Sequence, residues 1–103
     1  MLPGRTAIAS QSMAQHFDLR GKVAMVTGGA RGIGFATCDE LARRGARVVV
    51  VDLHADAVES AAESLPGEAF GIAADVTDRG AMQAAVAEIV ERFGGLDVVV
   101  ANA

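Results

Sequence analysis

Two kinds of apolar pattern alternate along this chain, and the alternation restricts the folds that it can adopt. The first kind is a short continuous run, rich in valine, which is typical of a strand buried on both faces of a parallel sheet. Four such runs occur, at Val23–Val26, Val48–Val51, Ala69–Ala73 and Val98–Val100. The second kind lies between the runs, repeats at helical spacing and predicts helices with one buried face.

Three helical stripes separate the four runs. In chain order they comprise Gly34, Cys38, Leu41 and Gly45; Val58, Ala62 and Leu65; and Met82, Val86, Ile89 and Phe93. Pro66-Gly67 and Gly94-Gly95 are expected to end the second and third helices, because glycine readily adopts the left-handed conformation that closes a helix. Thr77 or Asp78 is expected to cap the start of the third. The chain therefore reads β-α-β-α-β-α-β.

This order of elements predicts an α/β fold of the doubly wound (Rossmann) type, in which right-handed helical crossovers join parallel strands. In the strand order 3-2-1-4-5-6 of that fold, the fourth strand is interior and pairs with a fifth. Because the sequence ends at Asn102-Ala103, just after the fourth run, we expect it to be the N-terminal part of a longer protein. A complete four-stranded domain is the alternative. We expect residues 1–16 to form a flexible N-terminal extension, and residues 17–103 a domain incomplete at its C-terminal end.

Composition and charge exclude several classes of function. Thirteen acidic and nine basic residues leave a formal net charge of −4, whereas a surface for nucleic acid or anionic membrane would carry a basic stripe. No apolar run approaches the roughly 18 residues that cross a bilayer. One cysteine, Cys38 on a helical stripe, fits a structural thiol in a reducing cytoplasm. His16 and His54 have no ligand cluster around them, so we expect no metal, nucleic-acid or membrane partner.

A glycine-rich loop joins the first run to the first helical stripe and reads Thr27-Gly28-Gly29-Ala30-Arg31-Gly32-Ile33-Gly34. Glycines permit a sharp turn from strand to helix and let the backbone approach a pyrophosphate closely, while the helix N-terminus offers free N–H groups. The spacing T-G-x-x-x-G-x-G differs from G-x-G-x-x-G, and no Lys-Ser or Lys-Thr follows as in a P-loop. Glycines are also common in ordinary turns, so the loop needs a second feature to indicate a nucleotide.

Asp52 supplies that second feature. It follows the second run, about 20 residues after Gly32, where an acid would meet the adenosine ribose hydroxyls of a dinucleotide. A carboxylate there accepts from the 2′-hydroxyl and repels a 2′-phosphate by on the order of a few kcal/mol, so NAD is favoured over NADP. Arg31 acts modestly in the opposite direction, because a base in the loop would attract a 2′-phosphate. The alternative role for Asp52 is to cap the helix that follows it.

Four motifs in this order resemble the short-chain dehydrogenase/reductase family: the loop, Asp52, Asp75-Val76 after the third run, and Asn102-Ala103 after the fourth. T-G-x-x-x-G-x-G is the pattern of that family's ordinary oxidoreductase branch, and the resemblance runs from about Phe17 to the end of the sequence. It implies that residues 17–103 form an NAD(P)-binding Rossmann domain.

The resemblance also implies roles for the residues of the glycine loop. Gly28, Gly32 and Gly34 would shape the pyrophosphate turn, and the backbone near Ile33 would face the phosphates.

The motifs after the other strands have implied roles as well. Asp52 would hold the ribose, and Asp75 and Val76 would meet the adenine edge by side chain and main chain respectively. Asn102 would stabilise the sheet around the cofactor, although the family often has a second Asn where this chain has Ala101.

The catalytic groups of the family have no counterpart here. Family members move a hydride between a nicotinamide ring and a carbinol or carbonyl carbon, with a Tyr as acid/base, a Lys that lowers its pKa and a Ser that positions the substrate. This chain has no Tyr, its one Lys is Lys22, and no Ser follows Ser64. We therefore expect it to be inactive alone, and to supply the cofactor-binding half of a homo-oligomeric oxidoreductase for a small alcohol or carbonyl compound. A non-catalytic nucleotide-binding module with a sensing or partner role is the alternative.

Overall fold

The computed structural model describes residues 18–102. In that range the elements are, in order, β1 (Val23–Thr27), α2 (Gly32–Arg43), β2 (Arg47–Asp52), α3 (Ala55–Glu63), β3 (Ala69–Ala73), α4 (Arg79–Phe93) and β4 (Val98–Ala101). Each predicted run is a strand and each stripe falls on a helix, although Gly45 and Leu65 lie just past the helix ends. The extension expected for residues 1–16 lies outside the described residues.

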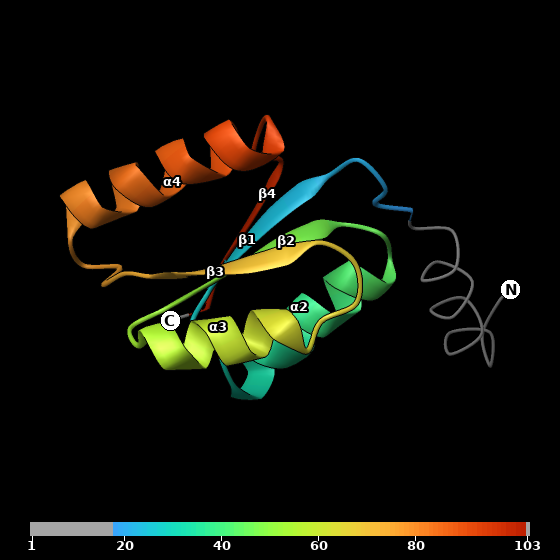
Figure 1. Ribbon diagram of the computed structural model, residues 1–103, viewed down its shortest axis with the longest axis horizontal. Helices are drawn as coiled ribbons and strands as arrows, with labels where there is room; N and C mark the ends of the chain where they lie inside the picture. The colour runs from blue at the N-terminus through green and yellow to red at the C-terminus, as the bar shows by residue number, and fades with distance from the viewer. Residues whose placement is uncertain (1–17, 103) are drawn as a thin grey trace, which may run out of the picture.

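The four strands form one parallel sheet in the order β3-β2-β1-β4, which confirms the predicted doubly wound, Rossmann-type α/β fold. Helices α2 and α3 lie on one face of the sheet and α4 lies on the other (Figure 1). Because all the strands are parallel, their carboxyl ends lie along one edge of the sheet. Strand order reverses between β1 and β4, and in open α/β sheets this reversal marks where ligands bind.

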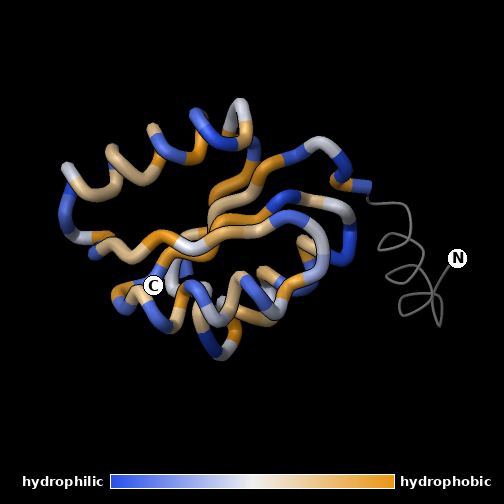
Figure 2. Tube along the Cα trace, in the orientation of Figure 1, coloured by the Kyte–Doolittle hydropathy of each residue, from blue (hydrophilic) through white to orange (hydrophobic). Residues whose placement is uncertain are grey.

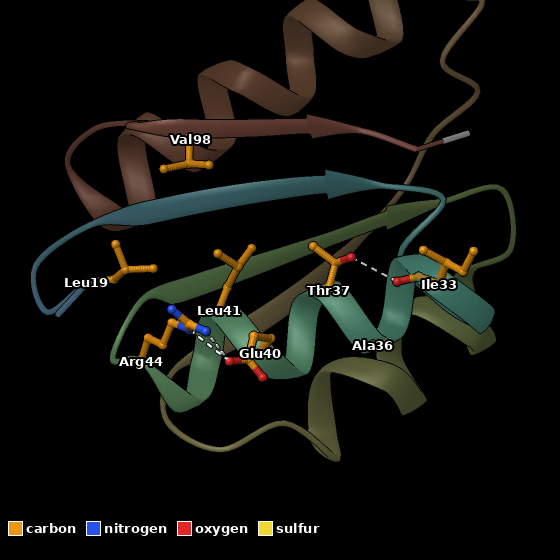
Figure 3. A pocket seen from close by; sticks show the side chains of 8 residues that line it. All are labelled: Leu19, Ile33, Ala36, Thr37, Glu40, Leu41, Arg44 and Val98. Carbon is orange, nitrogen blue, oxygen red and sulfur yellow. Dashed lines mark hydrogen bonds and ion pairs between the residues drawn. The ribbon is translucent and has the colours of Figure 1, made fainter. Parts of the chain in front are cut away.

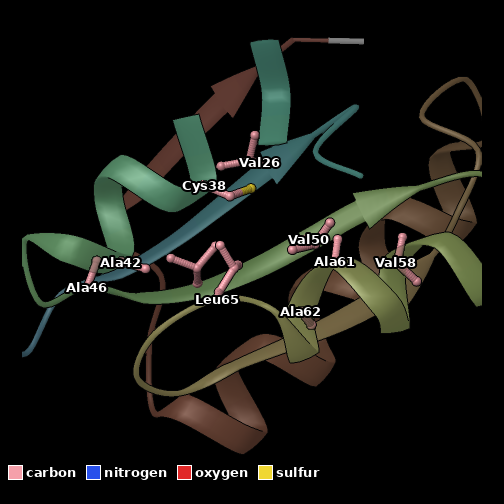
Figure 4. Close-up of a cluster of buried hydrophobic side chains, with 10 residues drawn as sticks. Val26, Cys38, Ala42, Ala46, Val50, Val58, Ala61, Ala62 and Leu65 are labelled. Carbon is pink, nitrogen blue, oxygen red and sulfur yellow. The ribbon is translucent and has the colours of Figure 1, made fainter. Parts of the chain in front are cut away.

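Strand β2 lies at the centre of the core, and its valines Val48 to Val51 are each 0% exposed. Because successive side chains of a strand point to opposite faces, Val48 and Val50 pack with residues of α2 and α3, whereas Val49 and Val51 pack with Ile89 of α4. Figure 4 shows Val50 among the side chains of α2 and α3. Hydrophobic residues are concentrated along the strands (Figure 2). Burial on both faces is thus as predicted for β1 and β2.

The same prediction is wrong for β3 and β4, the two outer strands of the described sheet. In β3 only Phe70 is buried. In β4 the side chains alternate between half-buried and exposed, and Val99 is 56% exposed. An outer strand has a neighbour on one side only, so the helices that cover the middle of the sheet leave it partly open. A run of apolar residues does not distinguish the two environments.

The ends of α4 follow the predicted local signals, whereas α3 ends at Glu63 with Ser64 as its C-cap residue, before the predicted Pro66-Gly67. Asp78, one of the two residues predicted as the cap of α4, accepts a hydrogen bond from the N–H of Ala81 at 3.0 Å, and Gly94 closes that helix with a φ of 85°. On α2, Leu41 of the predicted stripe is half-buried and packs against the core, and Ala42, which the stripe did not include, is buried as well. Ala42 lies four residues after Cys38, a full turn along the same face.

Candidate functional site

The glycine loop turns the chain from β1 into α2 at the carboxyl edge of the sheet. Gly28 and Gly32 have φ values of 64° and 61°, in the left-handed region where a side chain is strained. Arg31 is the N-cap residue of α2, and its side chain makes no capping hydrogen bond. The first backbone amides of a helix have no acceptor within the helix. Because the Arg31 side chain does not accept from them, they are available to bind another acceptor, such as an anion.

Two further glycines allow the loop to pack closely on its surroundings. A Cβ on Gly34 would lie 2.0 Å from the carbonyl oxygen of Gly28 and 2.7 Å from Nδ2 of Asn102. A Cβ on Gly29 would lie 2.9 Å from a backbone oxygen of β1 and 3.0 Å from Sγ of Cys38. Gly34 is a predicted site residue, whereas sequence analysis assigned no role to Gly29. The close packing at Gly29 depends on Cys38, which lies nine residues later in α2.

Asp52 ends β2 beside the loop, and its carboxylate has two backbone donors. Oδ2 accepts from the N–H of Ala30 at 3.1 Å, and Oδ1 accepts from the N–H of Leu53 at 2.9 Å. The alternative role as a cap of α3 is wrong, because the N-cap residue is His54 and no side chain caps that helix. Asp52 instead fastens the end of β2 to the glycine loop, a contact that sequence analysis did not predict.

Asp52 and Asp75 meet in a small pocket at the carboxyl edge of the sheet. The pocket has a volume of about 100 Å³ and is lined by Gly28, Asp52, Leu53, Ala74, Asp75 and Val76. Leu53 and Val76 are 60% and 40% exposed, so two apolar side chains lie beside two carboxylates. Sequence analysis missed Leu53. Leu53 belongs to no periodic apolar pattern, so hydrophobic spacing could not identify it. Its position directly after Asp52 was the one feature that could have indicated a place in the site.

Asp75 is held in place by the residue two positions after it. Its Oδ1 accepts from the backbone N–H of Thr77 at 2.9 Å and from the Thr77 hydroxyl at 2.7 Å. These bonds lower the pKa of Asp75, so this exposed carboxyl group is ionised at neutral pH. The N–H of Ala74 donates to the carbonyl oxygen of Asp52 at 2.9 Å, which keeps the segment after β3 beside the end of β2.

Asn102 links the end of β4 to the end of β1. Its backbone N–H donates to Oγ1 of Thr27 at 3.0 Å, and its Nδ2 donates to the carbonyl oxygen of Gly28 at 3.3 Å. The Thr27 hydroxyl in turn donates to the carbonyl oxygen of Val100 at 3.4 Å. Asn102 therefore lies against the glycine loop, where the strand order reverses, and is not among the residues that line the pocket of Asp52 and Asp75.

The structure places Arg31 and Ile33 outside the pocket of Asp52 and Asp75. Arg31 borders a hollow of about 320 Å³ between the loop and α3. Ile33 is 79% exposed and borders an apolar hollow of about 550 Å³ between α2 and β4, together with Leu19 and Val98 (Figure 3). Gly28, Asp52, Asp75 and Val76 thus line one pocket, whereas Arg31 and Ile33 each border a separate hollow.

Comparison with known proteins identifies the family. The family model described as short chain dehydrogenase matches residues 22–103. This chain belongs to the short-chain dehydrogenase family. The match covers β1 to β4 and includes the glycine loop, so the predicted family is confirmed, as is the predicted N-terminal portion of its fold.

Three relatives with dehydrogenase names illustrate the similarity to the short-chain dehydrogenase family. The sorbitol dehydrogenase of Cereibacter sphaeroides is 42% identical over 85 residues, which cover 82% of this chain and 33% of the relative. The D-threitol dehydrogenase of Mycolicibacterium smegmatis is 41% identical over 99 residues, covering 91% and 38%. The cyclohexanol dehydrogenase of a Rhodococcus species is 42% identical over 106 residues, covering 88% and 39%. The chain spans about a third of the length of these relatives.

Among the residues that the structure describes, the other reactive groups form no second site. Cys38 is buried, and burial raises the pKa of its thiol to about 11, which agrees with the predicted structural role. Within residues 18–102, no group of three or more His, Cys, Asp or Glu side chains is arranged to hold a metal ion. In the same range, no helix has the length and apolar character needed to span a membrane.

Proposed function

We propose that this protein is an oxidoreductase that transfers a hydride between a nicotinamide cofactor, with NAD favoured, and an alcohol or carbonyl substrate. This chain supplies the cofactor-binding half. The observation that carries the proposal is the pocket in which Asp52 and Asp75 lie beside Gly28, at the sheet edge where open α/β proteins bind ligands. The family match supports a nicotinamide cofactor, and the names of the sorbitol, D-threitol and cyclohexanol dehydrogenases support an alcohol substrate.

The residues of the loop fit the pyrophosphate of a dinucleotide. Gly28 and Gly32 have the φ values that this turn requires, and at Gly34 there is no room for a Cβ. The N-terminus of α2 carries unpaired amides and a partial positive charge, both of which attract phosphate oxygens. The backbone near Ile33 belongs to this first turn of α2 and would contribute to the same contact.

The pocket residues fit the adenosine half of the cofactor. Asp52 would accept hydrogen bonds from the ribose hydroxyls and would repel a 2′-phosphate, which favours NAD over NADP. Asp75 and Val76 would meet the edge of the adenine, and the exposed Leu53 adds an apolar surface for its ring. Arg31 borders a different hollow from this pocket, and its attraction for a 2′-phosphate would act modestly against the preference for NAD.

The bound cofactor would supply the hydride acceptor or donor, and the proton transfer needs groups that this chain lacks. It contains no Tyr, and Lys22 precedes β1 at the opposite edge of the sheet from the pocket. We therefore assign the catalytic Ser, Tyr and Lys to the part of the protein that corresponds to the remaining length of the relatives. The 103 residues alone would be inactive. We also propose a cytoplasmic location and a homo-oligomeric state for the whole protein.

Cofactor binding and turnover by the protein as purified from its source test the proposal. We expect NADH to bind at least tenfold more tightly than NADPH in a fluorescence titration, and NAD reduction with polyols or cyclic alcohols. The 103-residue chain serves as the control without turnover. Failure to bind either nucleotide would contradict the proposal. Nucleotide binding without turnover of any alcohol or carbonyl compound would instead favour the non-catalytic module.

A further inference from the structure

Thr77 lies next to the pocket of Asp52 and Asp75 without lining it. Both of its donors, the backbone N–H and the side-chain hydroxyl, bond to the same oxygen of Asp75, Oδ1, at 2.9 and 2.7 Å. Asp75 does line the pocket. Thr77 therefore acts on the pocket only through the carboxylate of Asp75.

Two donors on one oxygen fix the orientation of the Asp75 carboxylate. An exposed aspartate otherwise samples several rotamers, and ordering it on binding has an entropic cost. In the described part of the chain, hydrogen bonds reach Oδ1 of Asp75 and none reaches Oδ2. One oxygen is therefore anchored by Thr77, and the other remains an acceptor for a ligand.

The Thr77 hydroxyl is not required to start α4. Asp78 caps that helix by accepting from the N–H of Ala81, and the N–H of Asp78 donates to the carbonyl oxygen of Asp75 at 3.0 Å. These two bonds close the turn and begin the helix without the hydroxyl. The bond from the hydroxyl to Asp75 thus serves the carboxylate rather than the backbone of the turn.

We propose that Thr77 is a positioning residue for cofactor recognition. By holding Oδ1 of Asp75, it presents Oδ2 as the acceptor for the exocyclic amino group of the cofactor's adenine. This inference rests on the proposed function, because the adenine contact of Asp75 belongs to it. Thr77 itself touches no part of the cofactor.

The first experiment compares Thr77→Val with Thr77→Ser in the full-length protein. The probes are NAD and the analogue whose purine carries hydrogen in place of the 6-amino group. We expect Thr77→Val to bind NAD about three- to tenfold more weakly, because the Asp75 carboxylate then has one anchoring donor instead of two and must be ordered on binding. Its affinity for the analogue should equal that of the unmodified protein, and Thr77→Ser should restore NAD binding. Equal weakening for both probes would show a merely structural role and overturn the proposal.

A second variant, Asp75→Asn, keeps the proposal testable if Thr77→Val folds poorly. The asparagine oxygen would take the two bonds from Thr77, which turns the amide NH₂ toward the ligand. The hypoxanthine analogue of NAD, with a 6-oxo acceptor, should then bind this variant more tightly than NAD does. An unchanged preference for NAD would overturn the proposal.

The unmodified protein separates the two hypotheses. If it binds NAD and the analogue without the amino group equally well, the role of Thr77 is refuted while the proposed function stands. If it binds no nicotinamide nucleotide, both fail together.

Discussion

The carboxylate of Asp52 accepts a hydrogen bond from the backbone N–H of Ala30, 22 residues earlier in the chain, at 3.1 Å. Its other oxygen accepts from the N–H of Leu53. The acid proposed to choose between NAD and NADP therefore also holds the glycine loop against the end of β2. Cofactor preference and loop position depend on the same side chain.

Asp52→Ala should therefore weaken NADH binding by at least tenfold and also lower the free energy of unfolding. Two backbone donors lose their acceptor, and we expect a loss of about 1–2 kcal/mol. Fluorescence titration and denaturant unfolding measure the two effects. Asp56→Ala, which removes an exposed acid from the first turn of α3, is the control and should leave cofactor affinity unchanged. An Asp52→Ala protein of undiminished stability would show that the bond to Ala30 does not anchor the loop.

Gly34→Ala should abolish cofactor binding and destabilise the fold by more than about 2 kcal/mol, since its Cβ would lie 2.0 Å from a backbone oxygen of Gly28. Gly80→Ala is the matched control. Gly80 is an exposed glycine in α4 whose Cβ would meet nothing closer than 3.5 Å, and alanine there should add about 0.5 kcal/mol of stability. Thermal unfolding with and without NADH distinguishes the two variants. Tight NADH binding by Gly34→Ala would contradict the close packing of the loop.

Cys38 should make stability fall at high pH. Burial raises the pKa of its thiol from 9.0 to about 11, so the folded state favours the protonated form. This contribution is fully present below pH 9, where the unfolded chain also keeps its proton, and is lost as pH rises to 11. The loss is at most about 2–3 kcal/mol. The difference in unfolding free energy between the unmodified protein and Cys38→Ala, measured from pH 8 to 11, checks this; a constant difference would contradict it.

Arg47→Met should destabilise the protein by about 1–2 kcal/mol. The guanidinium donates to the carbonyl oxygen of Phe93 at 3.2 Å and lies 4.8 Å from the centre of the Phe93 ring. Arg47 therefore provides a donor and a positive charge at the C-terminal end of α4. Arg43→Met removes an exposed ion pair with Asp39 on α2 and should cost no more than about 0.5 kcal/mol. Urea unfolding of both variants provides the measurement. Equal effects would mean that the contact with Phe93 contributes little.

Sequence patterns sufficed to predict the strands, the strand order and the glycine loop. The valine runs of β1 and β2 reflect burial on both faces, and the gap from Gly32 to Asp52 reflects one complete crossover. These features are local or depend on short, regular spacings. Asp52, Asp75 and Gly28 meet in one pocket because parallel strands end at a common edge, which the order of elements already implies.

The parts that sequence patterns did not predict depend on contacts between distant segments. The bond from Ala30 to Asp52 and the packing of Gly29 on Cys38 need the folded loop, and neither leaves a periodic signal. Val99 has the same sequence character as Val49, yet it is exposed because β4 lies at the edge of the described sheet. Patterns along the chain predict which element forms, but not how completely its neighbours cover it.

A second group of contacts lies at the amino ends of the strands, opposite the pocket. There Val23 and Asp97 exchange two hydrogen bonds of 2.9 Å, and Arg47 reaches the end of α4. Because these contacts share no residue with the glycine loop, substitutions at this edge can raise or lower melting temperature while nucleotide preference stays constant. Thermal stability and cofactor selectivity can therefore be changed by substitutions at different ends of the same sheet, in evolution or by engineering.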